Sequence, residues 1–293
     1  MADKIFDDAF FQKLNTLKLS MNMRLNQGMS GARKSSAKGT SVEFSDFREY
    51  MLGDDIRRID WNAYGRMDKL FIKQFMEEKE GLYHVFLDTS KSMDFGTPKK
   101  SRLALQLSGA IAYLVLNNLD RVYVTQVQEN ALSEGKGLSG RNAFKQILNE
   151  LSRISFDGAT TLNASIMRRD IKGRGCSILI SDFLDPAGVE QTLRYLKYKK
   201  QDIVLIQVLA RQEVTIEDEG CLNLIDSETN QIVKVTMNRK LIESYEERLR
   251  SHQNALAALA KKYEAAYLRC VADETIDQVL FGGLQNSGLV MNK

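Results

Sequence analysis

Residues 83–92 read YHVFLDTSKS, an apolar run that leads directly into an acid and two hydroxyl residues at alternate positions. The apolar part has the composition of a strand buried on both faces, as the central strands of parallel sheets are. Asp88, Ser90 and Ser92 then offer three oxygen ligands where that strand ends. Hard oxygen donors are the ligands that Mg²⁺ and Mn²⁺ prefer. The stretch therefore predicts a strand of an α/β sheet that ends at a cation site.

Four further short apolar runs follow, and segments with helical periodicity separate them. In the first such segment, Leu103, Leu107 and Ile111 fall on one helical stripe. Regular alternation of strands and helices predicts an α/β fold, with an open, doubly wound, mostly parallel sheet and helices on both faces. The expected strands are Val85–Leu87, Val122–Val124, Ile178–Ile180, Ile203–Leu209 and Tyr267–Val271.

Two more oxygen donors fall where other strands meet helices. Thr160 lies in the glycine-containing turn Gly158–Leu162, and Asp182 follows the apolar run Cys176–Ile180 after one residue. Ligands of open α/β sheets gather at the carboxyl ends of the strands. The predicted metal site therefore has five members, with water completing the shell of Mg²⁺ or Mn²⁺ and a partner's acidic side chain able to join it. They are Asp88, Ser90, Ser92, Thr160 and Asp182.

A simpler interpretation of the triplet is a turn in which Asp88 and the serines cap the helix that follows. Such residues favour caps because their side chains bond to nearby backbone amides. Thr160 and Asp182, each at another strand-to-helix junction, favour the metal site over this interpretation.

The chain falls into two predicted domains, residues 1–80 and residues 81–290. The first combines a short helix near 8–22 with a basic glycine-serine stretch and a charged, aromatic segment. The second is the α/β domain, with an insertion at about 212–265. This insertion contains a β-hairpin over 219–238 and a long helix over 239–265, with Leu241, Leu249 and Leu256 facing inward.

Composition excludes several classes of protein. The net charge of +3 over 293 residues is too small to indicate nucleic-acid binding, and apolar runs such as Ile203–Ile206 are too short to cross a bilayer. The start MADKIFDD is acidic, unlike a secretory signal. Three widely spaced cysteines suit reduced thiols, and two histidines leave little material for imidazole catalysis. We expect a cytoplasmic protein without a membrane span.

Residues 35–75 are too charged for a core and too rich in aromatics for a disordered segment. One interpretation is a structural clasp, in which arginine–carboxylate pairs hold an irregular loop. The other is a partner-docking surface, because Trp, Tyr and Arg favour the centres of interfaces. The residues to which both interpretations apply are Arg48, Tyr50, Asp54, Asp55, Arg57, Asp60, Trp61 and Arg66.

The D-x-S-x-S motif at 88–92, a threonine after a glycine turn and an aspartate after a later strand resemble the metal-ion-dependent adhesion site (MIDAS) of von Willebrand factor A domains. The resemblance implies that Ser90, Ser92 and Thr160 coordinate the ion, while Asp88 and Asp182 often act through water. Lys91, between the two serines, departs from that pattern.

The segment before the strand resembles the signature of the DUF58 family. The resemblance is strong over about 30–95 and looser to about 275. It implies a von Willebrand A-like domain with an added β subdomain, and a protein that acts beside a MoxR-type AAA+ ATPase in assembly or maturation of other proteins. The matching residues are Gly31, Ser35, Glu43, Phe44, Arg48, Tyr50, Gly53, Asp54, Asp55, Arg57, Ile59, Asp60, Trp61, Arg66 and Lys73.

Taken together, these patterns predict a non-enzymatic, divalent-cation-dependent protein-binding module. An adaptor role with a MoxR-type ATPase follows from the resemblance alone. Two alternatives stay open: a metal-assisted phosphoester hydrolase that uses the same acids, and a scaffold whose metal site no longer functions and whose 43–66 segment binds the partner.

Overall fold

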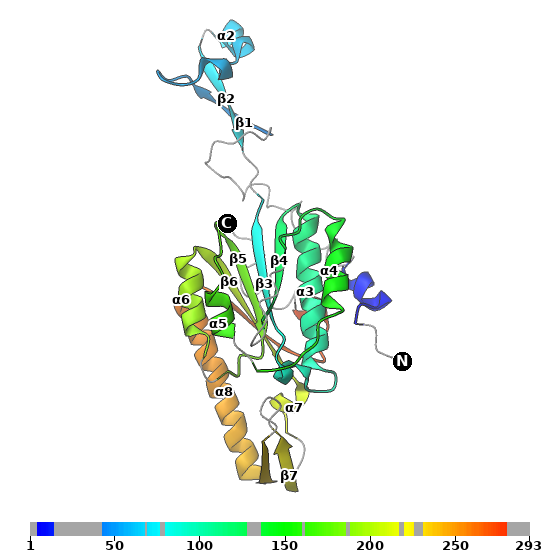
Figure 1. The fold of residues 1–293 in the computed structure, drawn as a ribbon. Coiled ribbons are helices and arrows are strands. Elements are labelled where there is room, and N and C mark those ends of the chain that lie inside the picture. The colour runs from blue at the N-terminus through cyan, green and yellow to red at the C-terminus, as the bar shows by residue number, and fades with distance from the viewer. Residues whose placement is uncertain are drawn as a thin grey trace. The chain divides into compact units, whose positions relative to one another are not determined.

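The computed structural model describes residues 5–14, 43–67, 69–76, 80–127, 136–159, 162–185, 188–216, 220–225 and 231–279. These residues belong to two compact units (Figure 1). The smaller unit lies within Leu25–Glu80, and the larger combines Met1–Arg24 with Gly81–Asn292. Outside the described residues lie Thr160, the basic glycine-serine stretch over 28–38 and the polar residues 226–230, where the sequence predicts the turn of the hairpin.

The larger unit is built on a five-stranded sheet in the order β4-β3-β5-β6-β9, with every neighbouring pair parallel. Each expected strand falls within one of these, so the predicted α/β sheet is confirmed. The strands are β3 (Leu82–Asp88), β4 (Arg121–Val127), β5 (Gly175–Ser181), β6 (Gln201–Leu209) and β9 (Ala266–Val271).

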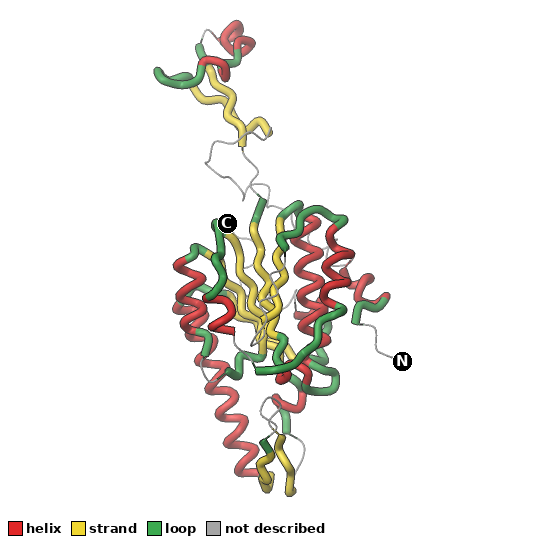
Figure 2. The backbone as a smooth tube through the Cα atoms, viewed as in Figure 1, coloured by secondary structure: helices red, strands yellow, loops and turns green. Residues whose placement is uncertain are grey.

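Helices cover both faces of this sheet, as a doubly wound fold requires (Figure 2). Val85 and Leu87 point to a core shared with α3 (Lys100–Asn117), α4 (Ala143–Leu151) and the helix over residues 8–14. Phe86, between them, points to a second core. That core is shared with α5 (Leu162–Met167), α6 (Glu190–Tyr198) and the C-terminal half of α8 (Arg239–Lys262).

The strand order reverses between β3 and β5. From β3 the chain passes to β4 on one side, then returns to β5 on the other side of β3 and continues outward through β6 and β9. Such a switch point separates the loops at the carboxyl ends of the two strands and leaves a place for a ligand. Asp88 ends β3 and Asp182 directly follows the end of β5, so these two predicted site residues lie at this switch point.

The hairpin and the long helix of the insertion are both present. Strands β7 (Gly220–Ile225) and β8 (Ile232–Met237) pair antiparallel, after the short helix α7 (Arg211–Val214). The side chain of Asn238 then caps α8 by accepting a hydrogen bond from the amide of Leu241 at 2.9 Å. The N-terminal half of α8 extends beyond the sheet toward the hairpin (Figure 1).

Two details of the sequence prediction are wrong. Leu241 was expected inward, but it is 38% exposed because the first turns of α8 lie beyond the sheet that would cover them. The sequence Asp185-Pro186 has the pattern of an N-cap followed by proline at the first helical position, which predicts a helix from Asp185, but the helix begins only at Glu190. The amide of Gly188 bonds to the carbonyl of Asp185 in a turn, and Gly188 has φ +68°, which a right-handed helix does not allow.

The smaller unit is an antiparallel hairpin of β1 (Glu43–Glu49) and β2 (Phe71–Met76), connected through the 3₁₀ helix η1 (Ile56–Arg58) and the helix α2 (Trp61–Met67). Ile59 and Ile72 form an isolated bridge and are both buried. The amide of Asp60 bonds to the carbonyl of Phe71, which ties the connection to β2.

Candidate metal centre

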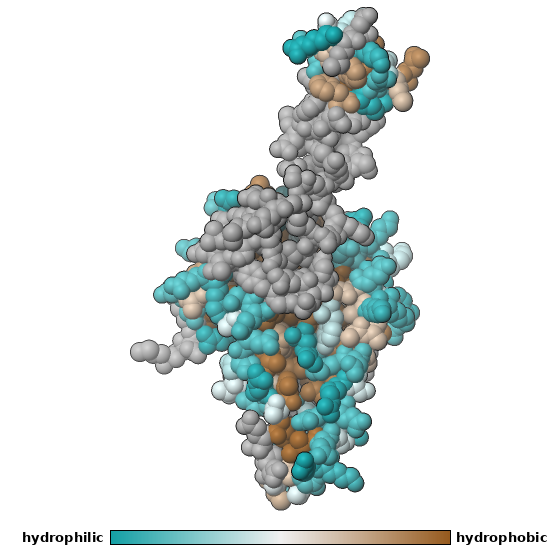
Figure 3. Space-filling view, turned by 180° about the vertical axis from the view of Figure 1, so that it is seen from behind, coloured by the Kyte–Doolittle hydropathy of each residue, from teal (hydrophilic) through white to brown (hydrophobic). Residues whose placement is uncertain are grey.

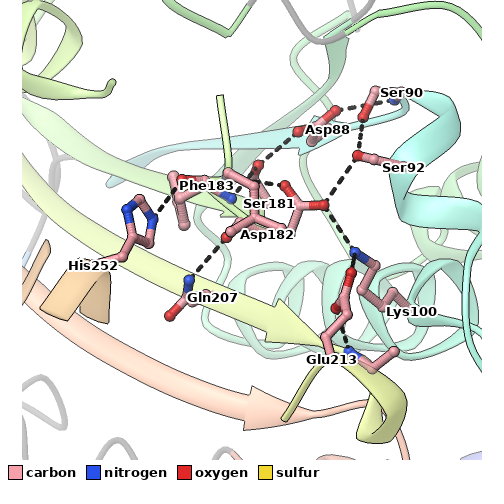
Figure 4. Close-up of polar contacts among 12 residues, drawn as sticks. Asp88, Ser90, Ser92, Lys100, Ser181, Asp182, Phe183, Gln207, Glu213 and His252 are labelled. Carbon is pink, nitrogen blue, oxygen red and sulfur yellow. Dashed lines mark hydrogen bonds and ion pairs between the residues drawn. The ribbon is translucent and has the colours of Figure 1, made fainter. Parts of the chain in front are cut away.

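The candidate centre is formed by the ends of β3 and β5, which are adjacent and in register, with Leu87 opposite Ile180. Asp88 is therefore brought beside Ser181 and Asp182 by the sheet itself (Figure 4). Both aspartates are almost completely buried. The topology thus places two carboxylates at the position where open α/β sheets bind ligands.

The turn after Asp88 carries the two serines toward Asp182. Asp88 Oδ1 accepts a hydrogen bond from the Ser90 amide at 3.0 Å, and the chain then enters a 3₁₀ helix over Lys91–Asp94. The hydroxyls of Ser90 and Ser92 are 3.0 Å apart, and Ser92 Oγ donates to Asp182 Oδ2 at 3.0 Å. Four of the five expected ligands thus lie in one connected network (Figure 4).

The serines do not serve as helix caps. Ser90 precedes the 3₁₀ helix but makes no side-chain capping bond to it, and α3 begins nine residues after Lys91 with Lys99 at its N-cap. Asp88 does form the local turn with the Ser90 amide that the capping interpretation expects. Its other oxygen, Oδ2, accepts from Ser181 Oγ at 2.6 Å, so the carboxylate also joins two strands.

The loop that leads to Thr160 contacts the same turn. The amide of Lys91 donates to the Gly158 carbonyl at 3.0 Å, and the amide of Asp157 donates to the Thr89 carbonyl at 3.0 Å. These two bonds hold residues 157–158 against the D-x-S-x-S turn. Thr160, two positions further along, lies outside the described residues.

A lysine that the sequence analysis missed lies inside the network. Lys100, the first residue of α3, has no exposed surface, and its Nζ is 2.9 Å from Asp182 Oδ2 and 2.6 Å from Glu213 Oε1. Burial opposes the charged form, but the two carboxylates outweigh it and raise the pKa of Lys100 above its usual value. The site therefore contains an ammonium ion at neutral pH.

Glu213 connects this ammonium to the insertion. It lies on α7, and its second oxygen, Oε2, accepts from the amide of Ala210 at 2.7 Å. Its backbone carbonyl accepts from the hydroxyl of Tyr245, on α8, at 2.9 Å. The centre at the sheet edge and the first part of the long helix thus share one residue.

Polar groups of the neighbouring strands β6 and β9 fix the backbone of Asp182. Gln207 Nε2, on β6, donates to the Asp182 carbonyl at 2.9 Å, and Gln207 Oε1 accepts from the Tyr267 hydroxyl at 2.5 Å. Burial raises the pKa of Tyr267 to about 12, so this phenol stays protonated as a donor. Ser181 Oγ also accepts from the amide of Phe183 at 3.0 Å. These bonds fix the backbone from which the Asp182 carboxylate projects.

The donors present fit a small hard cation. They are carboxylate and hydroxyl oxygens that converge from two segments, residues 88–92 and 181–182, and Mg²⁺ is commonly held by one or two carboxylates with water in the remaining positions. Within the described residues, no three His, Cys, Asp or Glu side chains gather as a metal cluster. With so few carboxylates, any ion held here would rely on hydroxyls, and we expect modest affinity for the ion alone.

Two sequence signals could have located the missed residues. Lys100 begins the apolar stripe that continues through Leu103 and Leu107, so it is a cation on the buried face of a helix. Gln207 interrupts the apolar strand β6, where a buried amide needs specific partners. Glu213 gave no comparable signal, because the position of α7 depends on the path of the chain after β6.

In the smaller unit, the acids expected in the clasp make local bonds. The Asp54 carboxylate accepts hydrogen bonds from the Arg48 guanidinium at 2.8 Å and from the Met51 amide at 2.9 Å. Asp55 accepts from the Arg57 amide at 3.0 Å. Asp60 accepts from the amides of Asn62 and Ala63 at 2.9 and 3.2 Å, which caps α2.

The aromatic residues of the same unit are placed differently. Trp61 is 64% exposed and meets Tyr64 edge-on at 6.3 Å between ring centroids. Figure 3 shows hydrophobic residues at the surface of this unit. Tyr50 is half-buried, and Arg57 and Arg66 are exposed. We define the exposed apolar surface as Phe47, Met51, Leu52, Ile56, Trp61 and Tyr64.

The chain matches the family described as "Protein of unknown function DUF58" over residues 46–255. It belongs to that family. The uncharacterized protein Rv1480 of Mycobacterium tuberculosis is 25% identical over 260 residues, which cover 86% of this chain and 82% of that protein. The uncharacterized protein MAV169 of Mycobacterium avium is 27% identical over 117 residues, 40% of this chain and 68% of that protein.

Solved structures give weaker likenesses. BatB from Bacteroides thetaiotaomicron is 16% identical, with a TM-score of 0.44 over 71% of this chain and 99% of that chain. The VWA domain of SpRpn10 is 14% identical, with a TM-score of 0.31 over 44% of this chain and 76% of that chain. The manganese-loaded Plasmodium vivax TRAP protein is 18% identical, with a TM-score of 0.34 over 44% of this chain and 57% of that chain. Within the described residues, every helix is too short or too polar to serve as a membrane span.

Proposed function

We propose that this protein is a divalent-cation-dependent protein-binding module, in which Asp88, Ser90, Ser92, Thr160 and Asp182 hold Mg²⁺ or Mn²⁺. The observation that carries the proposal is the network in which the Ser90 and Ser92 hydroxyls lead from the end of β3 to the Asp182 carboxylate after β5. This convergence involves residues 90 positions apart in the chain.

The ion would give the sheet edge a positive centre that takes an acidic side chain of the partner. The chain's own residues supply the rest of the site. Ser181 holds Asp88, Gln207 holds the Asp182 backbone, and the turn from Asp88 to Ser92 presents the hydroxyls. Both carboxylates are almost completely buried.

The partner proposal rests on family resemblance. A MoxR-type AAA+ ATPase is the partner that DUF58 resemblance implies, and an adaptor role in assembly or maturation follows from it. We further propose a cytoplasmic location, because Cys176, Cys221 and Cys270 are all free thiols, as expected in a reducing compartment.

Calorimetric titration of Mg²⁺ and Mn²⁺ tests the proposal. The wild type should bind one ion, and Asp88→Asn, which preserves size but removes a buried charge, should abolish the heat. The matched control is Asp202→Asn, the same change at an exposed residue near the opposite, amino end of β6. Equal heats from wild type and Asp88→Asn, or none from either, would count against the module.

Two other functions give different outcomes. A metal-assisted phosphoester hydrolase would turn over p-nitrophenyl phosphate in a manner that depends on Asp88 and Mg²⁺. A scaffold without a working ion site would bind the ATPase equally well with Asp88→Asn but lose binding with Trp61→Ala. The proposed module predicts no turnover and partner capture that EDTA abolishes.

A further inference from the structure

The Lys100–Glu213 pair is the feature of the candidate centre that its proposed ligands do not explain. Lys100 is fully buried, and Glu213 has a side chain only 15% exposed. A buried ion pair costs solvation energy from both charges, and well-packed apolar residues are often at least as stabilising. Stability alone is therefore a poor reason for this pair to stand at the sheet edge.

The contacts of Lys100 place its charge on an expected ligand. Its Nζ shares Asp182 Oδ2 with the Ser92 hydroxyl, and each lies about one hydrogen-bond length away, at 2.9 and 3.0 Å. An ammonium on that oxygen competes electrostatically with any cation that Asp182 would bind. It also reduces the negative charge that a partner's carboxylate would meet there.

Charges joined by these contacts can be counted. Asp88, Asp182 and Glu213 are three carboxylates against the single ammonium of Lys100, which leaves two net negative charges. A divalent ion would make that cluster neutral. Without Lys100 the ion-loaded cluster would stay negative and repel a carboxylate, whereas without the Glu213 charge it would be positive and attract one more strongly.

We propose that Lys100 and Glu213 are specificity-determining residues of the ion site, with opposite effects. Lys100 lowers affinity for a free divalent cation and raises affinity of the ion-loaded site for a carboxylate, and Glu213 does the reverse. This inference rests on the proposed function and names the ligand of the loaded site as a carboxylate. The pair therefore keeps the affinity for the ion alone low, and it favours binding of the ion and the partner's carboxylate together.

Three isosteric variants form a charge series at nearly constant shape. Glu213→Gln leaves one net negative charge, the wild type two, and Lys100→Met three. The double variant Lys100→Met/Glu213→Gln restores two. A unit charge within a few ångströms, even at an effective dielectric constant of about 20, changes cation affinity by roughly tenfold or more.

Mn²⁺ affinity measured by calorimetry should therefore rise from Glu213→Gln through wild type to Lys100→Met, by roughly tenfold at each step. Acetate binding to Mn²⁺-loaded protein, followed through water-proton relaxation, should fall in the same order. Acetamide, which is neutral, should show no such order. If Lys100→Met does not fold, Glu213→Gln against wild type still tests both signs.

Failure of this inference and failure of the proposed function are distinguishable. Mn²⁺ that does not bind the wild type, or binds it independently of Asp88, overturns the ion site and this inference with it. Mn²⁺ that binds through Asp88 with the same affinity in Glu213→Gln and wild type overturns the roles of Lys100 and Glu213 alone. Parallel rather than opposite trends for Mn²⁺ and acetate would overturn them as well.

Discussion

The ammonium of Lys100 and the hydroxyl of Ser92 meet on one oxygen, Asp182 Oδ2, at 2.9 and 3.0 Å. Lys100 comes from the first turn of α3, Ser92 from the turn after β3, and Asp182 from the end of β5. One carboxylate oxygen thus joins three segments of the larger unit. A change at this oxygen should affect both the stability of the fold and the binding of ions.

Lys100→Met should destabilise the protein by about 3–5 kcal/mol, because it leaves Asp182 and Glu213 buried without their ammonium. The measurement is urea unfolding followed by circular dichroism. The double variant Lys100→Met/Glu213→Gln should lose less free energy of unfolding, because only one buried carboxylate is then left without its ammonium partner. A single variant as stable as the wild type would show that the pair is not formed in solution.

Ser181→Ala should weaken Mg²⁺ binding and lower the free energy of unfolding by about 1–3 kcal/mol, because Asp88 Oδ2 loses its buried donor. Ser177→Ala is the matched control on the same face of β5, where Ser177 bonds Gln201 at 3.2 Å at the other end of the strand. It should cost stability without changing the ion's dissociation constant. Equal effects of both variants on binding would contradict the role assigned to Ser181.

His84 should make the protein less stable in acid. The ring is buried, stacks on Tyr123 at 4.6 Å, and finds no hydrogen-bond partner for either nitrogen among the described residues. Burial and the charge of Arg169 lower the pKa of His84 to about 4 from about 6.5 in the unfolded chain. The unfolded state therefore binds the proton first, and stability is lost as pH falls from about 6.5 toward 4.

The variant His84→Phe isolates this effect, because phenylalanine keeps the stacking and removes the titrating group. Between pH 7 and pH 4.5 the wild type should lose roughly 2–3 kcal/mol more unfolding free energy than the variant. Urea denaturation across this pH range measures the difference, in which the contributions of other groups cancel. Parallel curves would show that His84 titrates normally in the fold.

Asp60 and Trp61 are neighbours that should respond oppositely to substitution. Asp60→Ala removes the cap of α2 and should cost about 1–2 kcal/mol, seen as faster hydrogen exchange at the Asn62 and Ala63 amides. Trp61→Ala should change stability by less than about 0.5 kcal/mol, because the indole is exposed. Loss of partner binding only with Trp61→Ala would assign docking to the exposed apolar surface.

Trp61 is the chain's only tryptophan, so its fluorescence reports on that surface directly. In the free protein, iodide should quench it as it quenches a water-exposed indole. If the exposed apolar surface docks the partner, as in the scaffold alternative, binding of a MoxR-type ATPase should shift the emission to shorter wavelength and protect it from iodide. Unchanged emission in a complex confirmed by sedimentation would place the partner elsewhere.

The sheet was predictable because its strands are apolar on both faces. Val85, Phe86 and Leu87 are all fully buried, and no short amphipathic helix buries three consecutive side chains in this way. The convergence of Asp88 and Asp182 followed from the rule that parallel strands end at one edge. The hairpin was predictable from the apolar residues on either side of the polar stretch 226–230. The helix α8 was predictable from the long stretch of helical periodicity after Asn238.

The ammonium of the centre was not predictable in the same way. Whether Lys100 reaches Asp182 depends on where α3 starts, and the sequence places helix ends less reliably than helices. Glu213 and Lys100 are 113 positions apart in the sequence, so their contact depends on the packing of the whole fold. The helix α6 starts only after Gly188, because the positive φ of this glycine is not helical. The Asp185-Pro186 pattern gave no indication of this conformation.

The most direct test of the ion site is an anomalous difference map from crystals grown with Mn²⁺. We expect a peak between the ends of β3 and β5, with oxygens of the Asp88–Ser92 turn coordinated directly at roughly 2.1 Å or bridged to the ion by water. Thr160 and Asp182 should lie on the same ion. A map without density there, in crystals whose Mn²⁺ occupies other sites, would contradict the central claim.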